Sequence, residues 1–158
     1  ESAYRQAINL RPDYLEAHNN LGLALMDQGK IFDAELSFLH VIKLNPGHAG
    51  SQFNLGNIHH EKGRFHEAEE CYLKAIKLRP DYVEAHYRLG ITSQNLCRFS
   101  EAESSLRKAI SLNPSLIGPH DALGTLLLKT GLHREALEEK MKGGGLISFI
   151  VKGGWHIK

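Results

Sequence analysis

Residues 15–48 read LEAHNNLGLALMDQGKIFDAELSFLHVIKLNPGH, and residues 49–82 read AGSQFNLGNIHHEKGRFHEAEECYLKAIKLRPDY. Aligned without gaps, the two stretches share a Leu-Gly step, a Gly near the middle, an Ala-Glu step and a late Pro. The same places recur every 34 residues in the columns Gly22, Gly56, Gly90, Gly124; Ala34, Ala68, Ala102, Ala136; and Pro12, Pro46, Pro80, Pro114. A fixed period of this length is typical of proteins built from stacked structural repeats.

Each repeat is predicted to form two helices. The first helix of the opening repeat spans 15–28, and Gly29 ends it with a tight turn. A second helix follows, and Pro46 stops the hairpin because proline cannot continue a helix. The apolar positions at helical spacing are Leu21, Gly22 and Leu25 in the first helix and Ala34, Phe38, Val41 and Ile42 in the second.

The Leu-Gly step, the alanine, the aromatic and the closing proline resemble the tetratricopeptide repeat (TPR) family over residues 1–142. The resemblance implies an all-α fold, a right-handed superhelix of about four helical hairpins whose concave wall consists of the first helices. The predicted organisation is an orphan second helix at 1–14, full repeats at 15–48, 49–82 and 83–116, an incomplete repeat at 117–142 and a tail at 143–158. Because Glu1 shares a column with Glu35, we expect the chain to begin inside a hairpin of a longer array.

Three places depart from the pattern. Lys140 stands in the aromatic column, and Gly143 and Gly144 replace the expected alanine and isoleucine, so the last helix should end there. Cys97 occupies the column of Gly29, and we expect it to be a packed free thiol.

The tail after Gly144 is glycine-rich and β-prone, with the run LISFIV at 146–151. We interpret it first as the start of a following domain that is truncated. One alternative is an extended segment that packs on an exposed apolar end of the array, and another is an artificial addition.

The composition and charge of the chain exclude some classes of binding partner. The chain has 158 residues, 42% of them apolar, with 19 basic and 18 acidic side chains, so no net field attracts nucleic acid or an anionic membrane. Two cysteines, Cys71 and Cys97, are too few for a disulfide framework, and no apolar run is long enough to span a bilayer. Cysteine usage and the lack of a signal segment favour a cytoplasmic location.

One face of the first helices is predicted to line the groove, since offsets of three and four residues place side chains on one side of a helix. Side-chain amides can donate to and accept from a peptide backbone, so this face suits an extended polypeptide. Solvation of an exposed polar face is the alternative explanation. The candidate peptide-binding residues are Asn19, Asn20, Leu23, Met26, Phe53, Asn54, Asn57, His60, Tyr87, Arg88, Ile91 and Gln94.

The phrase EAHNNLG at 16–22 resembles, more narrowly, repeats of the O-GlcNAc transferase superhelix and related bacterial TPR proteins. That resemblance implies an asparagine ladder that holds substrate peptides. Asn20 and Asn54 match the ladder, whereas Arg88 and Ala122 replace it in the next two repeats.

No catalytic motif is present in the sequence. The adjacent His59 and His60 do not form a metal site, because neighbouring residues point about 100 degrees apart on a helix. We therefore expect no enzyme activity, cofactor or metal. His18, His86 and His120 share one column and are predicted to pack between hairpins.

The predicted function is a protein-interaction scaffold that binds an extended polypeptide in its groove, and homo-oligomers could form through exposed repeat ends. The alternative is the substrate-recruiting portion of a larger enzyme such as a glycosyltransferase.

Overall fold

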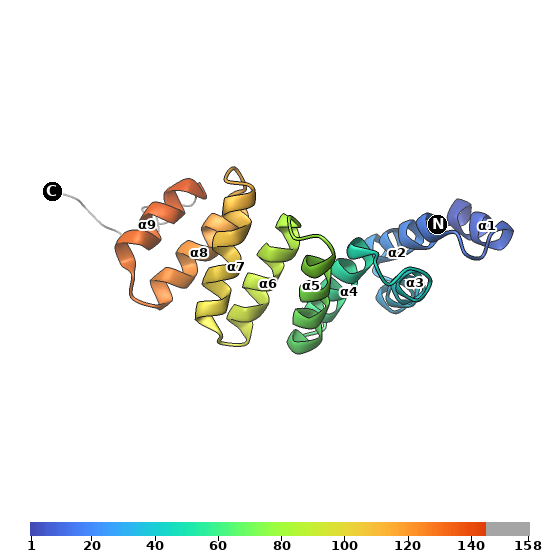
Figure 1. Cartoon of the computed structure of the whole chain (residues 1–158), viewed down its shortest axis with the longest axis horizontal. Coiled ribbons are helices and arrows are strands. Elements are labelled where there is room, and N and C mark those ends of the chain that lie inside the picture. Colours follow the sequence, from blue (N-terminus) through green and yellow to red (C-terminus); the bar gives the residue numbers. More distant parts are fainter. Residues whose placement is uncertain (145–158) are drawn as a thin grey trace. The chain divides into compact units, whose positions relative to one another are not determined.

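The computed structural model describes residues 1–144, and every regular element within them is an α-helix. The all-α fold class is confirmed, with successive helices paired as hairpins (Figure 1). The helices are α1 (Ser2–Leu10), α2 (Leu15–Asp27), α3 (Ile31–Leu44), α4 (Ala49–Glu61), α5 (Phe65–Leu78), α6 (Val83–Asn95), α7 (Phe99–Leu112), α8 (Ile117–Lys129) and α9 (His133–Lys142). The β-prone run at 146–151 lies outside the described residues.

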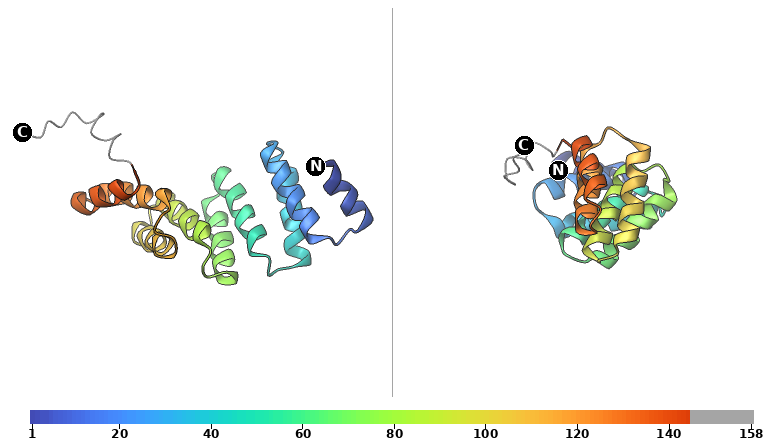
Figure 2. Two further views of the ribbon diagram at one scale, coloured as in Figure 1. Left: turned by 90° about the horizontal axis from the view of Figure 1, so that it is seen from above. Right: turned by 90° about the vertical axis from the view of Figure 1, so that its left-hand side faces the viewer.

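Contacts divide the chain into two compact units, Glu1–Pro80 and Asp81–Lys158. In the first unit, α2 pairs with α3 and α4 with α5, while α1 packs against α2 and α3 against α4. In the second unit, α6 pairs with α7 and α8 with α9, and α7 packs against α8. Figure 2 shows the hairpins of each unit from two further directions. The first helices of the pairs begin 34 residues apart, and so do the second helices, as the period predicts.

The repeated glycine on each first helix lets the second helix of the same hairpin pack closely. A Cβ added at Gly22 would lie 2.7 Å from Cε1 of Phe38, and one added at Gly56 would lie 2.7 Å from Cε1 of Tyr72. Both aromatic rings are fully buried. The glycine column and the aromatic column therefore form one packing unit, because the ring occupies the space that a larger side chain would need.

The turn inside each hairpin requires a left-handed backbone. At Gly29 φ is +72°, and the Lys30 N–H donates to the Leu25 carbonyl over 2.9 Å, which closes the first helix. Cys97 adopts the same conformation with φ +59°. The prediction that Cys97 is packed is wrong, since its side chain is exposed. The backbone geometry of the turn places this column at the surface, whatever residue fills it.

In two repeats the histidine column is bonded to the loop before the repeat. The Nε2 atom of His18 donates to the Pro12 carbonyl over 2.8 Å, and that of His120 donates to the Pro114 carbonyl over 3.0 Å. The sequence predicts only packing between hairpins at this column. The structure adds a hydrogen bond that satisfies the carbonyl of the proline that closes the preceding repeat.

The fourth repeat replaces an aromatic contact with a polar one. Lys140 stands where Phe38 and Tyr72 stand in the first unit, and its Nζ donates to Asp121 Oδ1 over 2.6 Å and to Thr125 Oγ1 over 2.7 Å. Helix α9 ends at Lys142, directly before the glycines. Among the helices in residues 1–144, none is long and apolar enough to cross a membrane.

Candidate functional site

The twelve predicted binding residues lie on three first helices, in two separate units. Helix α2 carries Asn19, Asn20, Leu23 and Met26, and α4 carries Phe53, Asn54, Asn57 and His60; both helices belong to the first unit. Helix α6, in the second unit, carries Tyr87, Arg88, Ile91 and Gln94. We define the amide face as the side of α2 and α4 that carries the eight residues of the first unit.

Two asparagines of the amide face are engaged within the protein. The Ser51 hydroxyl donates to Asn19 Oδ1 over 3.3 Å and links α4 to α2. The Tyr72 hydroxyl donates to Asn57 Oδ1 over 2.9 Å and links α5 to α4. These amides help to hold neighbouring helices together, so a bound peptide would compete with an existing bond for each of these oxygens.

Asn20 and Asn54 differ from their neighbours. They occupy equivalent places 34 residues apart, both are half-buried, and neither side chain has a hydrogen-bond partner in the described part of the chain. Each amide offers two N–H donors and a carbonyl oxygen, which matches the donor and acceptor groups of an extended backbone. Asn20 and Asn54 are therefore the asparagines of the face whose oxygen and N–H groups are both available for a ligand.

Three further members of the amide face, Met26, Phe53 and His60, pack against other side chains of the first unit. Met26 packs against the core cluster of the first unit, and the Phe53 ring centroid lies 5.8 Å from that of Tyr72. The His60 ring contacts Phe65 at 5.2 Å between centroids. Leu23 is more open than these three, with 40% of its surface exposed. The face thus presents apolar groups beside the two available amides.

The matching positions in the second unit are mostly structural. Tyr87 and Ile91 pack against a core cluster built on Leu106 and Leu123. The Gln94 amide donates to the Ala122 carbonyl over 3.4 Å, and Ala122 itself is buried in the ladder column. Arg88 is exposed and lies in the column of Asn54. No available amide continues the column within the described residues of this unit.

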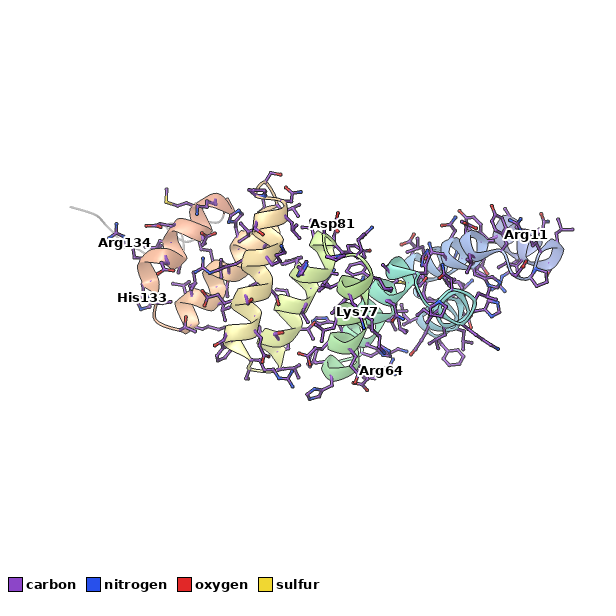
Figure 3. The ribbon with its side chains drawn as sticks, in the orientation of Figure 1. Arg11, Arg64, Lys77, Asp81, His133 and Arg134 are labelled. Atoms are coloured by element: carbon purple, nitrogen blue, oxygen red, sulfur yellow. The ribbon has the colours of Figure 1, made fainter. Side chains whose placement is uncertain are left out.

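A ladder of charge that the sequence analysis missed joins consecutive hairpins. The Glu35 carboxylate accepts from Lys62 Nζ and, over 3.0 Å, from Arg64 Nη2. Arg64, which is labelled in Figure 3, lies directly before α5. Glu1, one repeat earlier, accepts from Lys30 and Arg5, each over 2.9 Å. Two columns of opposite charge, 29 residues apart in sequence, carry this ladder, so a search for charge-paired columns could have found it.

The ladder lowers the pKa of its carboxyl groups. Burial raises the pKa of Glu35, but the hydrogen bonds from Lys62 and Arg64 outweigh it, so the pKa lies below the ordinary glutamate value. The bonds from Lys30 and Arg5 lower the pKa of Glu1 to about 2. Both shifts stabilise the charged form and suit an ion pair between repeats rather than an acid catalyst.

The fourth repeat lacks the basic residue of this ladder, and Arg107 of α7 instead pairs with Glu135 of α9 over 3.3 Å. Leu132 stands in the column of Lys30 and Arg64, so it cannot bind a carboxylate. Within the last hairpin, His120 Nδ1 lies 2.5 Å from Glu139 Oε2, and both side chains are largely buried. Burial raises the pKa of Glu139, whereas Lys142 and His120 lower it, and the net pKa is below the ordinary value.

Cys71 is a buried free thiol. Burial raises the pKa of the Cys71 thiol to about 11, which keeps it protonated and unreactive at neutral pH. In residues 1–144, no three His, Cys, Asp or Glu side chains gather closely enough to hold a metal ion.

Profiles of one protein family match most of the chain. A profile described as TPR repeat matches residues 2–29 and 56–96, and two profiles described as Tetratricopeptide repeat match residues 37–70 and 83–116. The chain is a tetratricopeptide repeat protein. No curated protein sequence matches this TPR protein significantly.

Solved structures share the TPR fold. A crystal structure of MamA is 25% identical, with a TM-score of 0.83 over 98% of this chain and 89% of that one. MamA from Desulfovibrio magneticus RS-1 is 22% identical, with a TM-score of 0.82 over 92% of this chain and 82% of that one. PilF from Pseudomonas aeruginosa is 21% identical, with a TM-score of 0.83 over 90% of this chain and 65% of that one. These structures support the TPR assignment and do not single out O-GlcNAc transferase.

The TPR arrangement is a scaffold that generally serves protein interaction. The first helices present side chains from a frame whose spacing is set by the repeat.

Proposed function

We propose that this TPR protein is a non-catalytic scaffold that binds an extended polypeptide segment along the amide face of its first unit. The observation that carries the proposal is the pair of half-buried amides, Asn20 and Asn54, which have no hydrogen-bond partner among the described residues. They stand at equivalent places on α2 and α4, so one strand of peptide could meet both. Their matching chemistry favours main-chain recognition over recognition of one particular side chain.

The apolar neighbours supply the second part of the proposal. Leu23 is exposed, and Phe53 is held in place by its contact with Tyr72. An aromatic ring that is fixed before binding loses little conformational freedom on binding. We infer that Leu23 and Phe53 contact ligand side chains between the two backbone contacts.

This mode corresponds to the asparagine ladder that the narrower resemblance implies, limited to two rungs. Asn19 and Asn57 are engaged within the protein, and Arg88 follows in the second unit. We therefore propose Asn20 and Asn54 as the primary contacts and the remaining predicted residues as secondary ones.

The test uses peptides selected from a library of unstructured sequences for binding to the intact chain. Replacing both Asn20 and Asn54 by alanine removes two amide contacts worth roughly 0.5–1.5 kcal/mol each, so affinity should fall about ten- to a hundredfold. The melting temperature should stay nearly unchanged, because neither amide bonds within the protein. Isothermal titration calorimetry measures the affinity.

A matched control replaces two exposed amides outside the face, Gln6 and Asn9 on α1. This variant should bind the selected peptides as the parent does. If the Asn20→Ala/Asn54→Ala variant also binds them with unchanged affinity, the amide face is not the binding site.

A further inference from the structure

Helix α3 carries an exposed apolar stripe. Phe32 is 69% exposed, Leu36 51% and Leu39 45%. The three residues are spaced by four and three positions, so they lie on one side of the helix. We call them the α3 stripe. Large apolar side chains that line up in water indicate a surface that another molecule covers.

The TPR fold itself does not demand this stripe. The same three positions in the other second helices hold mostly polar residues, so they play no part in stacking the repeats. In α5, α7 and α9 they are His66, Glu70, Leu73; Ser100, Ser104, Arg107; and Arg134, Glu138, Met141. Only α3, among the described helices, is apolar at all three.

A groove runs beside the stripe between α1, α2 and α3. Two adjoining clefts of about 480 Å³ and 230 Å³ form it, and both are lined by Arg5, Leu21 and Leu36. Ile8 adds apolar surface to the larger cleft and Leu25 to the smaller one. Polar residues line both clefts beside these apolar ones, and such a mixed groove can accept the apolar face of an amphipathic helix together with its flanking polar groups.

The charges around the groove are arranged in a self-complementary way. The larger cleft is lined by Arg5, His18 and His40 and by no acidic side chain, whereas Asp33 lines the smaller cleft. Asp33 precedes Leu36 by three residues, and His40 follows it by four. An acid and a hydrogen-bond donor thus stand on opposite sides of Leu36 on the same helix.

This order fits an antiparallel copy of the same helix. When two α3 helices cross in opposite directions at Leu36, Phe32 of one copy faces Leu39 of the other, and Asp33 of one faces His40 of the other. A two-fold interface requires each contact to occur twice, and the sequence around Leu36 satisfies that requirement. Asp33 of each copy also lies against the larger cleft of the other copy, which no acidic side chain lines in the described residues.

We propose that the α3 stripe is a homodimer interface, in which α3 of a second copy packs antiparallel against the groove between α1 and α3. This inference goes beyond peptide binding, because Asn20 and Asn54 lie on α2 and α4. The interface rests on about two turns of helix and is smaller than the usual ~800 Å² per partner, so the dissociation constant is on the order of 10–1000 μM.

Sedimentation equilibrium of the intact chain tests the proposal. The mean mass should rise from 17.7 kDa toward twice that value as concentration increases through this range. Leu36→Glu should raise the dissociation constant at least about tenfold, because it buries a carboxylate at the two-fold axis. Leu73→Glu is the matched control, since Leu73 is 50% exposed on α5, and it should leave association unchanged.

A charge exchange tests the antiparallel order. Asp33→Lys should weaken association about three- to tenfold, because it removes the carboxylate that accepts a hydrogen bond from His40 of the other copy. Asp33→Lys combined with His40→Asp should restore it. Circular dichroism checks that each variant remains helical.

Disulfide trapping gives a second measurement. In a Cys97→Ser background, Leu36→Cys should form a covalent dimer on mild oxidation, because the two-fold axis brings the two positions together. Leu73→Cys should not. A chain that stays at 17.7 kDa over the whole range, or an association that survives Leu36→Glu, overturns the interface. A charge-exchanged double variant no better than Asp33→Lys overturns the antiparallel order.

Discussion

Replacing Gly22 by alanine should destabilise the protein, although alanine is the better helix former. The added Cβ would lie 2.7 Å from Cε1 and 2.9 Å from Cζ of Phe38. Carbon atoms in contact normally stand about 3.5–4.0 Å apart, so the ring would have to move by roughly 1 Å. Phe38 is fully buried in the core cluster of the first unit and has no space for that shift.

The size of the effect follows from two opposing contributions. Forcing extra volume into a packed core costs about 1–3 kcal/mol, and this overlap belongs in the upper half of that range. The higher helix propensity of alanine returns about 1 kcal/mol. The free energy of unfolding should therefore fall by about 1–2 kcal/mol relative to the parent.

Urea denaturation followed by circular dichroism measures the change, with Gly50→Ala as the control. Gly50 lies in α4, and its added Cβ would approach nothing closer than His48 Cε1 at 3.3 Å. That substitution should change the stability by no more than about 1 kcal/mol, because the helix propensity of alanine opposes a single close contact with the His48 ring. If Gly22→Ala is no more destabilising than Gly50→Ala, the close packing of the glycine and aromatic columns does not limit the fold.

Two further outcomes are expected. Cys97→Gly should stabilise the protein by about 0.5–1 kcal/mol, because it relieves a left-handed conformation that disfavours any side chain, and a lowered urea midpoint would contradict this. Since the pKa of Glu35 is lower folded than unfolded, the ion pairs with Lys62 and Arg64 stabilise the protein above the ordinary glutamate pKa of about 4.3 and are lost as the pH falls through the lower folded value. Urea midpoints from neutral to about pH 3.5 should therefore depend less on pH in Glu35→Gln than in the parent, whereas Glu70→Gln, at an exposed pair, should leave the dependence unchanged.

The helix order followed from the sequence because its signals are local and repeated. The 34-residue period places each helix start, and the glycine at positions such as Gly29 marks each hairpin turn. The pairing of Gly22 with Phe38 was also within reach, since both lie in columns of fixed spacing. Cys97 broke the pattern in residue type only, because the turn geometry of the repeat persists without the glycine.

The candidate site could be placed on a helix face from the sequence, but its members could not be told apart. Asn19 and Asn20 are adjacent and chemically identical, yet Asn19 accepts from Ser51 of the next first helix, whereas Asn20 accepts from nothing in the described residues. Asn57 likewise depends on where the Tyr72 hydroxyl reaches. Residues in contact here are separated by 15 to 32 positions, and periodicity does not specify such pairs.

By itself, the sequence determined the class of fold, the helix order and the face that carries the amides, since each depends on spacing along one helix. Only the tertiary structure decided which amides are available, that Glu35 is held by Lys62 and Arg64, and that Lys140 bonds to Asp121 where an aromatic ring would otherwise pack. The physical reason is that a hydrogen bond or ion pair forms within about 3 Å, and that distance is set by how neighbouring helices pack against each other.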